Sequence, residues 1–123
     1  MKDLSDKIKQ KYSKIDVLLN NAGGANKTKQ ITTEGLEKTF ATNQMNYFVL
    51  STELLEIISE SNDGRIVNVA SNAHIGAEVD YENINSEKSF SAWTSYCVSK
   101  LMNIMFTYQP VSYTHLTLPT MLW

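Results

Sequence analysis

The sequence is poor in cysteine, in surplus charge and in long apolar runs, and each shortage excludes a class of protein. A single cysteine, Cys97, excludes a disulfide bond within the chain and fits a reducing compartment, so we expect a cytoplasmic location. The 11 basic and 13 acidic residues leave a net charge of -2, which provides no basic face for nucleic acid. No apolar stretch predicts a membrane span or a signal peptide.

What remains is the composition of an ordinary globular domain. Hydrophobic residues make up 42% of the chain and charged residues 20%, which predicts a folded core. At 123 residues the chain has room for one domain at most, and neither an internal repeat nor a linker marks a second one.

Two short apolar segments flank a long helical pattern. Residues 15–19 predict a fully buried parallel strand that ends in the loop residues 20–24, and residues 65–71 predict a second buried strand. A helix is expected from Thr33, because apolar residues recur three and four apart at Leu36, Phe40, Tyr47, Leu50, Leu54 and Ile58. Strand, helix and strand form a βαβ unit, and ligands of such sheets gather beyond the carboxyl ends of the strands.

Helices are also expected at both ends of this unit. The first is a surface helix with Leu4, Ile8 and Tyr12 on its buried stripe. The last begins at Ser91, after a long connection from residue 72, and its expected apolar side carries Trp93, Cys97, Leu101, Ile104, Met105 and Tyr108.

Three polar signals follow one another along this framework. They are Asn20-Asn21-Ala22-Gly23 after the first strand, Ser71 at the end of the second, and Tyr96-x-x-x-Lys100 on the last helix. Taken alone, each has a simpler explanation: a turn, a small residue that ends a strand, and a surface lysine above a half-buried tyrosine. Their order on the expected elements favours a functional site.

The same residues resemble the short-chain dehydrogenase/reductase family, over about residues 4–109. Segments 65–74 and 96–101 are similar to its retinol-dehydrogenase-like branch, although Asn46-Tyr47 stands where that branch often has Gly-His. The resemblance implies an α/β fold, a partial Rossmann-type doubly wound parallel sheet. It also implies hydride transfer between NAD or NADP and a small-molecule carbonyl or alcohol.

Site roles follow from this resemblance. Tyr96 would be the acid/base, Lys100 would favour its phenolate form and hold the nicotinamide ribose, and Ser71 would orient the substrate oxygen. Asn43, which by itself could be a satisfied core amide, matches the family asparagine that holds a water near the lysine. Asn20, Ala22 and Gly23 would lie beside the adenosine side of the cofactor, together with Tyr96 and Lys100 at the ribose, whereas Asn21 is expected to tie adjacent strands.

Other polar residues are not assigned to the site. His74 is a loop histidine without a carboxylate or cysteine partner, so a pocket wall or an exposed position is expected. Asp80, Glu82 and Glu87 show no metal-ligand spacing and predict a solvated loop face, so no metal is expected.

The chain is expected to be an internal piece of the enzyme, residues 1–110, followed by a non-native tail, residues 111–123. The tail has neither helical spacing nor alternation, and segment 111–120 resembles a translated sequencing adapter. No Gly-x-x-x-Gly-x-Gly follows a strand, so the pyrophosphate site is missing and the piece is expected to be inactive.

An oligomer is possible in the complete enzyme. Two other interpretations stay open: a non-catalytic Rossmann-type regulatory or interaction domain, and an interrupted read without function.

Overall fold

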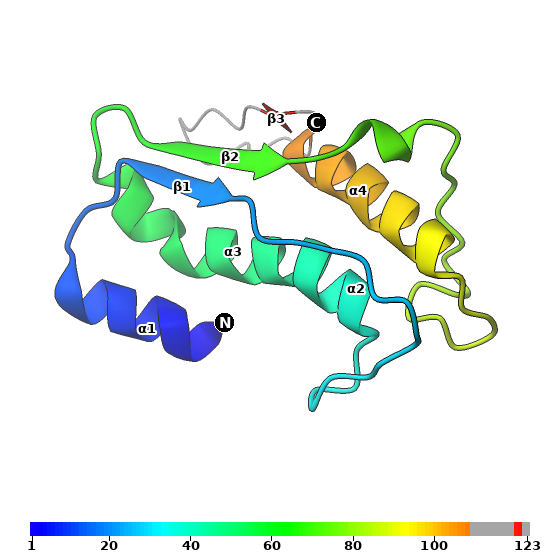
Figure 1. The fold of residues 1–123 in the computed structure, drawn as a ribbon. Helices are drawn as coiled ribbons and strands as arrows, with labels where there is room; N and C mark the ends of the chain where they lie inside the picture. The colour runs from blue at the N-terminus through cyan, green and yellow to red at the C-terminus, as the bar shows by residue number, and fades with distance from the viewer. Residues whose placement is uncertain (109–119, 122–123) are drawn as a thin grey trace.

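A computed structural model of the chain describes residues 1–108 and 120–121. It shows helices packed against a small parallel sheet (Figure 1), which confirms the expected α/β class. The elements in chain order are α1 (Lys2–Lys11), β1 (Val17–Asn20), α2 (Lys38–Phe40), the π-helical turn η1 (Ala41–Met45), α3 (Asn46–Ser59), β2 (Arg65–Val69), the 3-10 turn η2 (Asn72–His74), α4 (Ala92–Tyr108) and β3 (Thr120–Met121).

The sheet has the order β1-β2-β3, and both pairings are parallel. Residues of β1 and β2 pair from Val17 with Arg65 to Asn20 with Asn68, so both strands end at the same edge. This register brings the loops after β1 and β2 together, as a βαβ unit requires.

The apolar core lies between α3 and the strands. Leu54 and Ile58 of α3 and Ile66 of β2 are almost fully buried, and partly buried Ile8 of α1 and Leu18 of β1 pack around them. Burial of this apolar surface is the main contribution that holds β1, α3 and β2 together.

The expectation that the first strand is fully buried is wrong. Val17 is 54% exposed and Leu19 is 55% exposed, whereas Asn20 and the core-facing Leu18 point toward α3. Successive strand residues point to opposite faces of a sheet. In the described part of the chain, α3 and α4 both contact the face of β2 that carries Ile66 and Asn68, so the face of Val17 and Leu19 stays open.

The long helix begins at Lys38 rather than at Thr33. A turn precedes it, in which the amide of Gly35 donates to the Thr32 carbonyl and Gly35 has φ +85°. Glu37 caps the helix, because its carboxylate accepts from the amides of Thr39 and Phe40. The helical periodicity alone does not reveal this cap or the π-helical turn that follows α2.

The apolar side predicted for the last helix is only partly right: Cys97 is buried and Leu101 and Ile104 are partly buried, but its other members are exposed. Trp93 is 66% exposed and Tyr108 is 78% exposed. The buried residues of α4 are mostly polar: Cys97, Ser99, Lys100, Asn103 and Thr107. Three of them form hydrogen bonds to other elements: Ser99 to Asn43 of η1, and Asn103 and Thr107 to β2, so hydrogen bonding helps decide which face of α4 is buried.

A strand lies within the segment in which none was expected. Thr120 and Met121 form β3, which pairs with Asn68 and Val69 at the edge of β2. An open strand edge offers unpaired backbone groups to any nearby extended segment. The non-native origin of residues 111–123 stays a prediction, and residues 109–119 and 122–123 lie outside the described part.

None of the helices in the described ranges is both long enough and apolar enough to cross a membrane.

Candidate functional site

The predicted site residues come from four elements that meet at the carboxyl ends of β1 and β2 (Figure 1). A shallow hollow lies there, between the loop after β1, the end of β2 and the first half of α4. Its lining includes Asn21, Gly23, Gly24, Val69, Ala70, Tyr96 and Lys100. The structure therefore brings the signals from three separate segments to one place.

Lys100 lies beside Tyr96, one turn along α4. Its ammonium nitrogen Nζ is 5.7 Å from the centroid of the Tyr96 ring, and Lys100 is only 4% exposed. Burial lowers the pKa of Lys100 because the charged form loses its hydration. A cation at this place can stabilise negative charge on the phenol oxygen of Tyr96.

Asn43 holds the loop after β1 against the helices. Its Nδ2 donates to the carbonyl of Gly24 and to Oγ of Ser99, both at 2.9 Å, and its Oδ1 accepts from the Gly24 amide at 2.9 Å. Asn43 is fully buried within η1. Single π-helical turns inside α-helices often mark functional sites.

Gly23 lies where no side chain fits. A Cβ atom built on Gly23 would be 2.7 Å from Oδ1 of Asn43 and 3.3 Å from Nζ of Lys100. The first separation is shorter than real Cβ contacts allow, so the backbone of the loop passes directly beside both residues. A glycine at this position keeps the hollow open to a ligand.

Ser71 lies just beyond the end of β2 and caps η2. Its Oγ accepts from the amide of Ala73 at 3.2 Å, and its carbonyl lies 2.6 Å from Nδ1 of His74. η2 packs against α4, but Ser71 is not among the residues that line the hollow at Tyr96 and Lys100, and His74 is tied back to its own turn.

Asn20, rather than Asn21, is the residue that ties adjacent strands together in the structure. Asn20 is 3% exposed, and its Nδ2 donates to Oδ1 of Asn68 at 2.8 Å and to Oγ of Ser51 at 3.0 Å. Asn20 therefore ties β1 to β2 and α3, and its side chain does not reach the hollow. Asn21 is exposed and lines the hollow, because strand alternation turns its side chain the other way.

The buried bonds continue from Asn20 into α4. Asn68 is fully buried, and its Nδ2 donates to Oγ1 of Thr107 at 3.0 Å, which in turn donates to the Asn103 carbonyl. Nδ2 of Asn103 donates to the Val69 carbonyl. The role of Asn68 was not predicted, although a lone amide beside the apolar residues of the strand is the signal that could have revealed it.

Tyr47 is a second tyrosine at the site that was expected only as part of an apolar stripe. It is 2% exposed, and the centroid of its ring lies 5.9 Å from Nζ of Lys100. Its hydroxyl has no hydrogen-bond partner in the described part of the chain. Burial, and to a smaller extent the charge of Tyr96, raises the pKa of Tyr47 to about 12.

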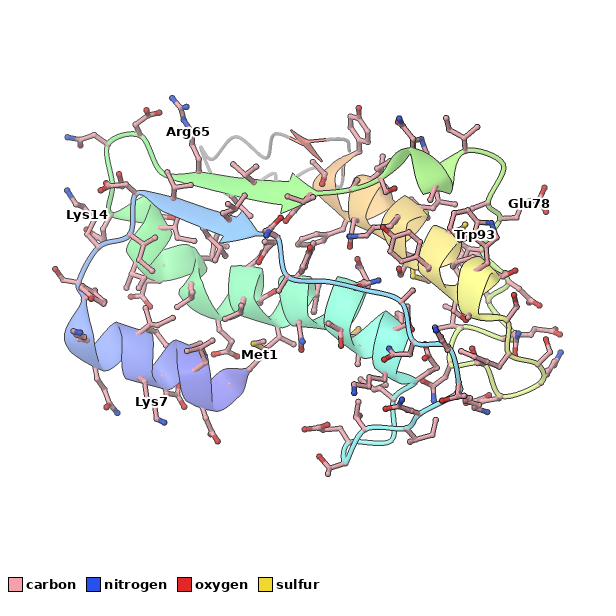
Figure 2. The ribbon with its side chains drawn as sticks, in the orientation of Figure 1. Met1, Lys7, Lys14, Arg65, Glu78 and Trp93 are labelled. Atoms are coloured by element: carbon pink, nitrogen blue, oxygen red, sulfur yellow. The ribbon has the colours of Figure 1, made fainter. Side chains whose placement is uncertain are left out.

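A second hollow borders the site on the other side of α4, between that helix and the loop after η2. Figure 2 shows Trp93 on α4 near the loop that carries Glu78, and both residues line this hollow together with Ile75. The rings of Trp93 and Tyr96 lie with centroids 6.0 Å apart. Trp93 and Ile75 are exposed, so the hollow offers apolar surface beside Tyr96.

Over the described residues, no group of three His, Cys, Asp or Glu side chains could hold a metal ion.

The chain is similar in sequence to proteins of a known family. The family model for short chain dehydrogenase matches residues 1–109. Human retinol dehydrogenase 11 is 41% identical over 93 residues, which are 76% of this chain and 29% of that protein. Human retinol dehydrogenase 13 is 31% identical over 108 residues, 87% of this chain and 33% of that protein.

A solved structure shows the same fold. An uncharacterised protein from Mycobacterium paratuberculosis superposes with a TM-score of 0.71 at 32% identity, over 84% of this chain and 37% of that one. The chain spans about a third of the length of the curated relatives it matches. The match of the family model over most of the chain shows that it belongs to the short-chain dehydrogenase family, with similarity to the retinol dehydrogenases.

Proposed function

We propose that this chain forms the catalytic part of an NAD(P)-dependent oxidoreductase that acts on a small-molecule carbonyl or alcohol. The observation that carries the proposal is the buried ammonium of Lys100, 5.7 Å from the Tyr96 ring and beside Gly23 at the open hollow. The family and its retinol dehydrogenase relatives support the same class of reaction.

The proton step belongs to Tyr96. In reduction its phenol donates a proton to the oxygen that gains negative charge, and in oxidation its phenolate accepts the proton of the alcohol. Lys100 supplies positive charge that stabilises the phenolate. The hydroxyl of Ser71 turns from its local bond with Ala73 to orient the substrate oxygen beside Tyr96.

Asn43 has a positioning role in this proposal. It fixes the loop at Gly24 and the helix at Ser99, so it sets how closely the loop approaches Lys100. The resemblance to the family implies that Asn43 would also hold a water near the lysine.

The residues around the hollow fit a nicotinamide cofactor, which supplies the hydride when it is bound. Tyr96 and Lys100 would hold the ribose, and the backbone of Ala22 and Gly23 would border the adenosine side. The close approach of the loop backbone at Gly23 to Lys100 supports this placement. Asn20 would take part only through its backbone, because its side chain is engaged inside the sheet. NAD and NADP both agree with these contacts.

The carbonyl or alcohol would enter from the second hollow, where Trp93 and Ile75 contact its apolar part. We expect the 123-residue chain by itself to show no turnover, because no glycine-rich loop in its sequence can bind the pyrophosphate.

The test is the variant Tyr96→Phe in the full-length enzyme that carries this segment. The change removes the transferable proton and keeps the ring, so turnover should fall by at least roughly a hundredfold while cofactor affinity stays near that of the wild type. Lys100→Ala should lower both turnover and cofactor affinity. Substantial turnover by Tyr96→Phe, with an unchanged pH profile, would show that another group is the acid/base.

A further inference from the structure

The ammonium group of Lys100 lies near two tyrosine rings from different elements. The Tyr96 ring on α4 is 5.7 Å from Nζ, and the Tyr47 ring on α3 is 5.9 Å from Nζ. Lys100 is 4% exposed and Tyr47 is 2% exposed, so this contact is shielded from water.

No other charged group compensates for the buried cation. In residues 1–108 and 120–121, no carboxylate lies within 4.0 Å of Nζ of Lys100. The loop after β1 presents Gly23, the end of β2 and the residue after it contribute apolar Val69 and Ala70, and η1 presents the neutral amide of Asn43. The two tyrosines are therefore the titratable groups that face the lysine.

Desolvation disfavours the charged form of Lys100, and an aromatic face opposes this effect. Attraction between a cation and an aromatic ring is strongest where water is excluded. The Tyr47 hydroxyl has no partner in the described structure, so the ring is the part of Tyr47 with an identified contact at the site.

We propose that Tyr47 is a positioning residue whose ring holds the ammonium of Lys100 beside Tyr96 and keeps it charged. The catalytic consequence rests on the proposed function, because only an acid/base at Tyr96 needs that charge. The effect on Lys100 itself does not depend on any reaction and can be measured in the 123-residue chain.

The first experiment titrates Lys100 by NMR in the full chain, with labelled lysine and Lys100→Arg to assign the signal. In Tyr47→Leu the midpoint of Lys100 should move to lower pH, because the ring that favours the cation is gone. Tyr47→Phe keeps the ring and should restore the wild-type midpoint.

A matched control comes from an exposed pair of the same kind. Nζ of Lys11 lies 5.3 Å from the ring centroid of Tyr12, which is 50% exposed. Water already solvates this cation, so Tyr12→Leu should leave the midpoint of Lys11 nearly unchanged. A shift at Lys100 without one at Lys11 supports a specific effect of the buried ring.

A volume-conserving substitution covers the case in which Tyr47→Leu does not fold. Pentafluorophenylalanine at position 47 keeps the size of the ring and reverses the charge distribution over its face, so the Lys100 midpoint should again move to lower pH. An identical midpoint in the phenylalanine and pentafluorophenylalanine variants would overturn the proposal.

The second experiment measures oxidation in the full-length enzyme. Tyr47→Leu should lower kcat roughly two- to thirtyfold and move the rising limb of the pH profile to higher pH, with KM for the substrate little changed. Tyr47→Phe should behave like the wild type. If Lys100 titrates as expected but Tyr96→Phe still turns over, the proposed function fails and the role of Tyr47 stands. If the enzyme needs Tyr96 but Tyr47→Leu matches Tyr47→Phe, the role of Tyr47 fails alone.

Discussion

The side-chain amide of Asn20 donates to Oδ1 of Asn68 at 2.8 Å and thereby joins two parallel strands through their side chains. Both residues are buried, and the same amide also donates to Ser51 of α3. Asn20 thus links β1, β2 and α3 by hydrogen bonds at the point where the loop of the site begins.

We therefore expect Asn20→Ala to lower the free energy of unfolding by about 1–3 kcal/mol, because it leaves the buried carbonyl of Asn68 unpaired. Denaturant unfolding followed by circular dichroism measures this loss. The neighbouring Asn21 is exposed, so Asn21→Ala should change stability by less than about 0.5 kcal/mol. Equal effects of the two variants would contradict the role assigned to Asn20.

Two adjacent glycines offer a second matched pair. Gly23→Ala would place a Cβ 2.7 Å from Oδ1 of Asn43, whereas the position at Gly24 has no atom within 4 Å. The crowded variant should lose about 1–3 kcal/mol of stability, and it should weaken cofactor binding in the full-length enzyme. Gly24→Ala should do neither. Fluorescence titration with reduced cofactor, together with thermal unfolding, distinguishes the two, and normal binding by Gly23→Ala would show that the loop does not border the cofactor.

Stability should fall at high pH because of Tyr47. Its pKa is raised from 10.0 to about 12 in the folded chain, so the folded state retains a proton that the unfolded state loses. This contribution is complete below pH 10 and is lost as the pH rises to about 12, and it amounts to on the order of 2 kcal/mol. The contribution of Lys100 to the pH dependence of stability has the opposite sign, because burial lowers the pKa of Lys100. The difference between wild type and Tyr47→Phe in urea unfolding from pH 9 to 12 isolates the tyrosine, and parallel curves would refute the assignment.

On the substrate side, Trp93→Ala should raise KM for apolar substrates roughly two- to twelvefold in the full-length enzyme, with kcat less affected. The indole offers exposed apolar surface beside Tyr96, and the variant removes it. Tyr81 is also exposed but does not line this hollow, so Tyr81→Ala serves as the control. An unchanged KM in Trp93→Ala would place the substrate elsewhere.

The strands, and the fact that the site residues come together at one edge of the sheet, can be predicted from the sequence because both follow from local rules. Apolar runs that end in polar loops mark β1 and β2, and parallel pairing then brings Ser71 and the loop at Gly23 to one edge. The spacing of Tyr96 and Lys100 places them one helical turn apart, which the structure confirms.

The errors arise where tertiary contacts override local pattern. Asn20 and Asn21 are the same residue type, and only the exact end of β1 decides which one points into the core. The buried side of α4 is polar because Thr107 and Asn103 form hydrogen bonds with the Asn68 side chain and the Val69 carbonyl of β2. The spacing of apolar residues does not reveal these hydrogen bonds. Tyr47 has a partner 53 residues away along the chain, so no local signal identifies its contact with Lys100.

The π-helical turn η1 also has a consequence for helical phase. Thr39, Asn43, Tyr47 and Ser51 are all buried and lie four residues apart, although four residues of a regular α-helix overshoot a full rotation by about 40°. A wider turn between Ala41 and Met45 absorbs part of this accumulated rotation and keeps the four side chains on one side. The number of residues in this turn is therefore constrained as tightly as their identity. Deleting a single residue from it would rotate Asn43 relative to Tyr47 and α3, and would misalign the site without altering any residue that touches a ligand.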